Sequence, residues 1–189
     1  TADILSLPDL PFRGLRGFAQ TPTFLPDGTL LSQAGYDPDS GLYLHLTDAV
    51  GICADVPIRQ ARELLMDELL GEFPFADAGS HAHAVSLLLH PFVRHMIDGP
   101  TPIFLIDAPA RGTGKGLLAD IVSGVSLGRS AAVMAMTKDD DELEKRVTAM
   151  MVEGHPMVLL DNVTALKSAT LSAALTTTLW RGRWLGKSQ

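Results

Sequence analysis

Residues 103–118 read IFLIDAPARGTGKGLL, and this stretch decides the fold that we expect for the chain. The apolar run 103–106 predicts a short buried strand. Residues 116–124 predict a helix, because their apolar side chains share one face. A glycine-rich turn joins the two. Strand, glycine turn, lysine and helix in this order are typical of a phosphate-binding loop, and an ordinary strand–helix turn is the alternative.

The candidate nucleotide-binding residues lie where this turn meets the helix. Gly112 and Gly114 allow the backbone to curl so that successive N–H groups point inward, toward phosphate oxygens. The start of the helix adds partial positive charge, and Lys115 can reach the outer phosphates of ATP. The predicted set is Arg111, Gly112, Thr113, Gly114, Lys115, Gly116 and Leu117.

Two positions depart from the usual pattern G-x-x-x-x-G-K-[ST]. Pro109 stands at the first glycine, and Gly116 stands where a Ser or Thr hydroxyl normally binds Mg²⁺. We therefore expect the ion to be held by water or another group, or to be bound weakly.

A second motif follows at residues 157–162, which read MVLLDN. An apolar strand that ends in a carboxylate, downstream of a phosphate loop, is typical of a Mg²⁺-coordinating strand, and this assigns Asp161 to the metal. The alternative is a buried strand whose final Asp caps a turn. Asn162 follows where an acidic, water-activating residue is usual, and an amide can orient a water but not take its proton. The predicted catalytic residues are Lys115, Asp161 and Asn162.

The composition restricts the class of protein. With 46% hydrophobic residues, the 189-residue chain can bury a proper core, and no apolar run approaches the length of a membrane span. Cys53 is the single cysteine, which excludes an internal disulfide and agrees with a cytoplasmic location. The net charge of −7 comes from residues 1–100, because residues 101–189 are almost neutral. Basic residues near the end of the chain could meet a phosphate backbone or another subunit, or form a solvated tail.

We expect three segments. Residues 1–56 form a β-rich lead-in, residues 57–98 a helical segment, and residues 99–189 the P-loop core. Residues 1–20 of this segment predict a linker or a lead-in to the fold, and a small β-meander follows. Its predicted strands are 23–25, 29–31 and 42–44. The predicted helices are 57–71 and 79–98, the second with Ser80 as its N-cap and with Pro91 kinking or dividing it.

Two clusters of potential metal ligands have simpler explanations. The helix at 79–98 carries four histidines, but His81 and His83 would point in nearly opposite directions, and no Cys or carboxylate stands at a ligand spacing. The acidic run 139–142 lies at the start of a predicted helix capped by Thr137, where carboxylates complement the helix dipole. We predict no metal site at either place.

The remaining elements complete the expected fold class. Residues 131–136 predict a second buried strand, 165–180 a helix and 183–185 the beginning of another strand. The class is α/β: a P-loop NTPase with a parallel sheet and flanking helices, preceded by the small β-rich segment and helices. The sequence ends where a central strand should run, and it begins with Thr rather than Met. We therefore expect a piece of a longer protein, since a sheet without its middle strand would have bare edges.

The order of the motifs resembles that of prophage and plasmid primase–helicase-like proteins. The resemblance covers most of the chain and rests on residues 21–28, 35–37, 71–75, 108–116 and 158–162. It implies an AAA+-like ATPase domain, similar to superfamily-three helicases, that works as a homo-oligomeric ring on DNA during replication of mobile elements. By this resemblance Lys115 has the Walker A role, residues 112–114 cradle the phosphates of ATP, and Asp161 binds Mg²⁺.

Three functions remain open from the sequence. The first is an ATP-driven motor acting on DNA, with Lys115 and Mg²⁺ on Asp161 stabilising in-line attack of water on the γ-phosphate. The second is a small-molecule kinase, although no arginine-rich lid precedes Asp161. The third is a nucleotide-binding or DNA-docking assembly module that does not hydrolyse ATP, which Gly116 and Asn162 favour.

Overall fold

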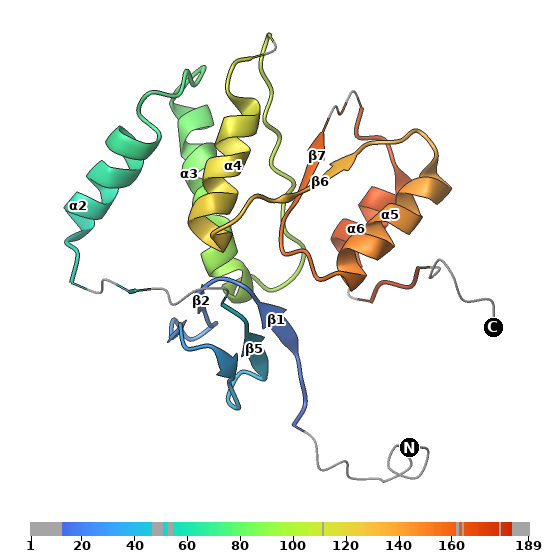
Figure 1. The fold of residues 1–189 in the computed structure, drawn as a ribbon, viewed down its shortest axis with the longest axis horizontal. Helices are drawn as coiled ribbons and strands as arrows, with labels where there is room; N and C mark the ends of the chain where they lie inside the picture. Colours follow the sequence, from blue (N-terminus) through green and yellow to red (C-terminus); the bar gives the residue numbers. More distant parts are fainter. Residues whose placement is uncertain are drawn as a thin grey trace.

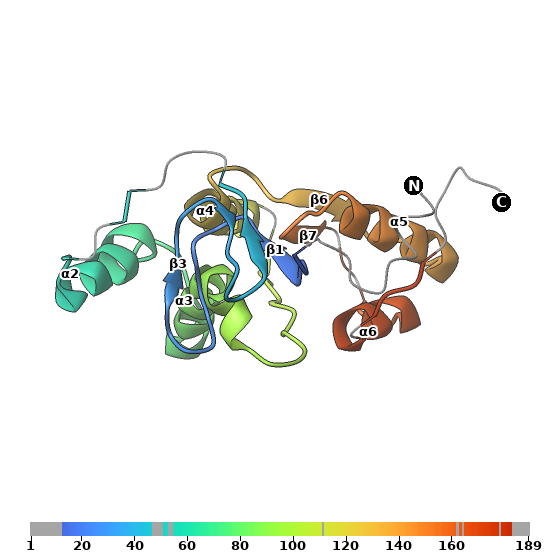
Figure 2. The ribbon, with the colours of Figure 1, turned by 90° about the horizontal axis from the view of Figure 1, so that it is seen from below.

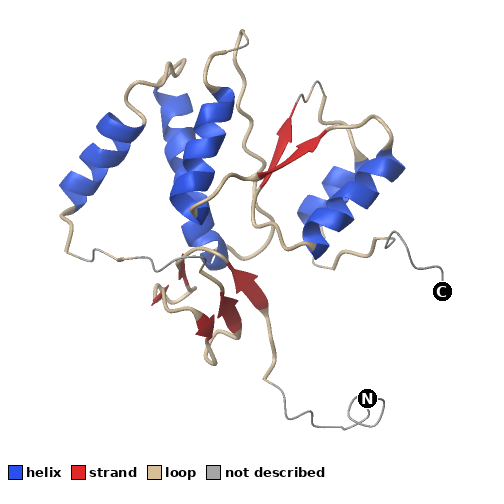
Figure 3. Cartoon of the chain, viewed as in Figure 1, coloured by secondary structure: helices blue, strands red, loops and turns tan. Residues whose placement is uncertain are grey.

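The computed structural model describes residues 13–46, 51–52, 55–110, 112–161, 163, 165–177 and 179–182, and it is a mixed α/β structure with small sheets (Figure 1). The strands gather in two places, one near the N-terminus and one between the later helices (Figure 3).

The N-terminal segment contains two small sheets. Strands β1 (Gly17–Ala19), β5 (Leu42–Leu44) and β4 (Gly35–Tyr36) form one sheet in the order β1-β5-β4, with β1 parallel and β4 antiparallel to β5. Strands β2 (Thr23–Phe24) and β3 (Leu30–Leu31) form an antiparallel hairpin. The predicted strand 42–44 is present in full, and those at 23–25 and 29–31 are each one residue shorter. The prediction of a linker or lead-in over residues 1–20 missed β1, whose three residues show no alternating pattern.

The hairpin turn forms because Asp27 and Gly28 fit it. Asp27 accepts a hydrogen bond from the Thr29 amide at 2.9 Å, and Gly28 has a φ of 86°, which an L-residue rarely adopts. Thr23 then ties the hairpin to the helical segment, since its hydroxyl donates to the Phe92 carbonyl at 3.0 Å.

The helical segment differs from the prediction in its details. Instead of one helix over 57–71, α2 (Ile58–Glu63) passes into a π-helical stretch, η1 (Leu64–Leu69). Helix α3 (Ala78–Val93) contains Pro91 in its last turn and continues as a short 3₁₀ stretch, η2 (Arg94–Met96), so the proline does not divide it. Its N-cap is Asp77 rather than Ser80, because the Asp77 carboxylate accepts the Ser80 amide at 2.6 Å.

The C-terminal segment alternates helices and strands. Its elements are α4 (Lys115–Leu127), β6 (Ala132–Ala135), α5 (Asp140–Val152), β7 (Val158–Asp161) and α6 (Ala169–Thr176). Strands β6 and β7 are parallel, with Ala135 opposite Asp161. Their apolar runs were predicted, and α6 is shorter than the predicted helix over 165–180. Residues 183–185, the last predicted strand, lie outside the described residues.

The predicted strand at 103–106 was wrong. This segment makes no ladder with β6 or β7, and its residues alternate between partly buried and exposed, with Leu105 73% exposed. Ile106 packs on helix side chains, and the Phe104 ring lies edge-on to His90 with centroids 5.5 Å apart. The apolar character of this run is explained by packing on α3 and α4, and not by burial inside a sheet. In the described part of the C-terminal segment, the parallel sheet is therefore only β6 and β7, and a P-loop fold is not shown.

Two separate apolar clusters stabilise the structure. Helices α3 and α4 lie side by side, and their cluster consists of Leu70, Ala84 and Leu118 with partly buried neighbours that include Ile106. Helices α5 and α6 pack together on the β6–β7 pair, around Met134, Leu143, Val147 and Leu171 (Figure 1 and Figure 2). Among the described residues, no helix has the length and apolar character needed to cross a membrane.

Candidate functional site

The turn before α4, residues 107–114, is here called the glycine turn. Gly112 and Gly114 have φ angles of 79° and 90°, in the left-handed region that favours glycine. Gly114 is the N-cap of α4, and its carbonyl accepts the Leu118 amide at 2.9 Å. The backbone conformation therefore favours glycine at both positions. Because Gly114 has no side chain, no side-chain cap binds the amides at the start of α4.

Lys115 folds back over the glycine turn. Its Nζ donates to the Ala110 carbonyl at 3.3 Å, and the Thr113 hydroxyl donates to the same carbonyl at 3.0 Å. Lys115 is exposed, so an anion in the turn could reach the ammonium group without unpacking any buried side chain. A carbonyl holds an ammonium less strongly than a phosphate does, because charge-assisted hydrogen bonds to an ionised acceptor are stronger.

The other predicted residues of the turn vary in what they can contribute. Gly116 and Leu117 lie exposed in the first turn of α4, and a Cβ added at Gly116 would meet no atom within 4 Å. The space for a hydroxyl is present, although the hydroxyl is not. Arg111 lies outside the described residues.

Asp161 ends β7 with an exposed side chain, and its backbone carbonyl accepts the Met136 amide at 3.5 Å. In Figure 1, α4 begins and β7 ends on the same, upper side of the molecule. The structure thus places the glycine turn and Asp161 toward a common side. Asn162, the predicted water-orienting residue, lies outside the described residues.

The histidines of residues 79–98 and the acidic run 139–142 were the two clusters of potential metal ligands in the sequence. Within the described ranges, no group of three or more His, Cys, Asp and Glu side chains could hold a metal ion. The acidic run has structural roles instead. Asp139, rather than the predicted Thr137, caps α5 by accepting the amides of Asp141 and Glu142 at 3.0 and 3.2 Å. Asp140 accepts a hydrogen bond from the Ser168 hydroxyl at 2.5 Å, and this bond holds the pKa of its carboxyl below the usual value.

Phe73 is a neighbour of the glycine turn that the sequence did not predict. A Cβ built on Gly114 would lie 3.6 Å from Cε1 of Phe73, so the aromatic ring covers the N-cap of α4. Phe73 belongs to a stretch that the sequence predicts only as a loop. The one available signal is the pair of phenylalanines around Pro74, because exposed loops rarely need two aromatic side chains so close together.

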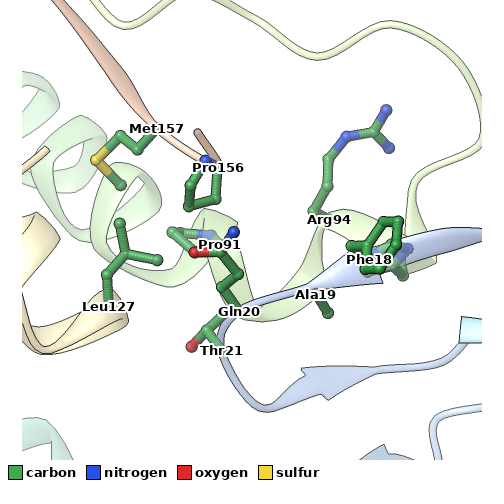
Figure 4. A pocket seen from close by; sticks show the side chains of 10 residues that line it. Phe18, Ala19, Gln20, Thr21, Pro91, Arg94, Leu127, Pro156 and Met157 are labelled. Carbon is green, nitrogen blue, oxygen red and sulfur yellow. The ribbon is translucent and has the colours of Figure 1, made fainter. Parts of the chain in front are cut away.

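A cavity lies where the three segments meet. This cavity of about 290 Å³ is lined by Gln20 of the N-terminal segment, by Pro91 and His95 near the end of α3, and by Met157 just before β7 (Figure 4). Burial, with a smaller contribution from the neighbouring Arg94, lowers the pKa of His95. Arg94 itself donates to the carbonyls of Ile97 and Gly99 at 3.0 and 3.3 Å, so it holds the turn after α3.

Comparison with known proteins adds no relative: no family model, curated protein or solved structure matches the chain. The function must therefore be argued from the residues of the glycine turn and β7.

Proposed function

We propose that the chain is an ATP-binding and ATP-hydrolysing domain of the P-loop class, from a DNA replication primase–helicase-like protein of a mobile element. The observation that carries this proposal is the glycine turn: two left-handed glycines lead directly into α4, and Lys115 folds over the turn, 3.3 Å from the Ala110 carbonyl. In this arrangement the ammonium can exchange a neutral carbonyl for a phosphate oxygen while the backbone stays in place.

The remaining residues would act in a hydrolysis reaction as follows. Backbone amides of residues 112–114 and the start of α4 would bind the β- and γ-phosphates, and Lys115 would stabilise the charge that develops during in-line attack by water. Asn162 would orient that water without taking its proton.

Mg²⁺ fits this site only with help from the substrate. The ion prefers oxygen ligands in octahedral geometry and usually combines one or two carboxylates with phosphate oxygens and waters. Asp161 supplies one exposed carboxylate, and Gly116 supplies no hydroxyl. When bound, the ion would neutralise phosphate charge. We therefore propose Asp161 as its protein ligand.

The test is ATP binding with and without Mg²⁺, measured by calorimetry on the chain and on Lys115→Ala. We expect affinity in the micromolar range, and a loss of about tenfold or more in the variant because a charge-assisted contact disappears. Lys145→Ala is the matched control, since Lys145 lies in α5 and pairs with Glu142 at 3.7 Å instead. Equal affinity in all three proteins, or no binding at all, would contradict the proposal.

A second candidate function is favoured by two residues. Gly116 lacks the metal-binding hydroxyl and Asn162 is not a base, so the domain could bind nucleotide without turnover and serve in assembly or DNA docking. DNA-stimulated phosphate release separates the two: the motor hydrolyses ATP faster with DNA, whereas the binding module retains ATP intact. A homo-oligomeric ring, DNA as partner and a cytoplasmic location belong to the motor proposal, and activity that rises with protein concentration would support the ring.

A further inference from the structure

The aromatic stretch that leads into α3 lies beside Gly114 of the glycine turn. Phe73 Cε1 and Cδ1 lie 3.6 and 3.9 Å from the position that a Cβ on Gly114 would occupy, which is ordinary van der Waals distance. The ring therefore lies against the left-handed residue that starts α4. Glycine is favoured here by the φ of 90°, whereas a Cβ would meet the ring only at an ordinary contact distance.

Phe73 is held in place by a row of rings and by an apolar cluster. The Phe73 and Phe75 rings are 5.9 Å apart, and Phe75 stacks on His81 of α3 with centroids 5.0 Å apart. Both phenylalanines pack against the cluster that contains Leu118, one turn into α4. Since the Leu118 amide donates to the Gly114 carbonyl, the cluster packs on the first turn of the helix.

The π-helical stretch before this segment sets its path. The Leu70 amide donates to the Leu65 carbonyl at 3.2 Å, five residues back, which widens the last turn of η1. Gly71 then passes so close to that turn that a Cβ would lie 2.2 Å from the Asp67 carbonyl oxygen. The chain can turn toward α4 here only because residue 71 has no side chain.

We infer that Phe73 is a positioning residue for the nucleotide site: it holds the glycine turn in its ligand-binding conformation by packing on Gly114. The inference rests on the proposed function for its ligand, but the contact acts in the free protein as well. Two glycines in one turn have many accessible conformations, and binding would have to order them. A ring packed on one of them removes part of that cost before the ligand arrives.

The experiment compares Phe73→Ala with Phe75→Ala. Both changes remove a half-buried ring from the same cluster, but of the two only Phe73 lies within 4 Å of the Cβ position at Gly114. In the ligand-free full chain, hydrogen exchange followed by NMR should show faster exchange of the Leu118 amide in Phe73→Ala than in Phe75→Ala, at similar melting temperature. For ATP we expect about tenfold weaker binding in Phe73→Ala and a much smaller loss in Phe75→Ala.

Two further measurements separate the possible failures. If Phe73→Ala does not fold, Phe73→Leu keeps most of the apolar volume and is expected to show the same exchange difference to a smaller degree. Tripolyphosphate should lose affinity by the same factor as ATP, since Phe73 acts on the turn and not on the base. Equal Leu118 exchange in the Phe73 and Phe75 variants would overturn the inference even if ATP binds. Failure of the wild-type chain to bind ATP would overturn the proposed function, while the exchange comparison would still decide the role of Phe73.

Discussion

The guanidinium of Arg129 donates a hydrogen bond to Gln20 Oε1 at 2.7 Å, across 109 residues of sequence. The other end of the same amide, Nε2 of Gln20, donates to the Gly154 carbonyl at 2.8 Å. One side chain of the N-terminal segment thus contacts both the loop between α4 and β6 and the loop between α5 and β7. The lead-in is attached to the segment that carries the candidate site.

We expect Gln20→Ala to lower the free energy of unfolding by about 0.5–1.5 kcal/mol, because it removes two exposed hydrogen bonds. Chemical denaturation measures the change, and Gln33→Ala, at an exposed turn position, is the control. A cycle with Arg129→Ala should show coupling between the two residues. Additive effects would mean that the bond contributes nothing measurable.

Gly116→Thr should strengthen ATP binding in the presence of Mg²⁺ by roughly tenfold, since it adds the missing hydroxyl where a new Cβ meets no atom within 4 Å. Calorimetry with and without the ion provides the measurement. Gly116→Val is the matched control, because it has the same branched shape without the oxygen. If Val gives the same gain, the improvement comes from the helix and not from the metal.

Gly71→Ala should destabilise the protein by about 1–3 kcal/mol, since the new Cβ would lie 2.2 Å from a backbone oxygen that can move only with η1. Gly124→Ala provides the opposite case: it lies inside α4 with no atom near the new Cβ, and it should stabilise by up to about 1 kcal/mol. Thermal unfolding of both variants tests the pair. A neutral Gly71→Ala would contradict the close approach.

The stability should fall as the pH is lowered from about 8 to about 5. Burial lowers the folded-state pKa of His90 and of His95 below the usual value of 6.5, with a smaller contribution from Arg94. Above that value both states are neutral, and the full stability is present. Below it the unfolded chain takes up protons that the folded chain does not, until the pH falls through the folded-state pKa.

The double variant His90→Gln, His95→Gln should flatten this dependence, as measured by denaturation at several pH values. His83→Gln, which alters an exposed residue of the same helix, should leave the slope unchanged. A slope that survives the double substitution would assign the effect to other groups.

Local patterns in the sequence determined those helices and strands that can be predicted from the residues of the segment itself. The apolar runs at 131–136 and 157–160 correspond to the strands β6 and β7. The glycine turn leads into a helix that begins at Lys115, as predicted. The reason is that hydrophobic periodicity and the backbone freedom of glycine act within a few residues. The assignment of ATP and Mg²⁺ comes from such patterns, that of DNA from the family resemblance, and both stay predictions.

Only the tertiary structure decided which partner each segment meets. The run 103–106 is as apolar as a buried strand, yet Leu105 is exposed and no strand pairs with it. Ile106 packs instead on the side chains of α3 and α4. Phe73 on Gly114 and Gln20 on Arg129 join residues far apart in the chain, and no local signal specifies such contacts. A sequence pattern records which side chains avoid water, whereas packing and hydrogen bonding in three dimensions determine what they touch instead.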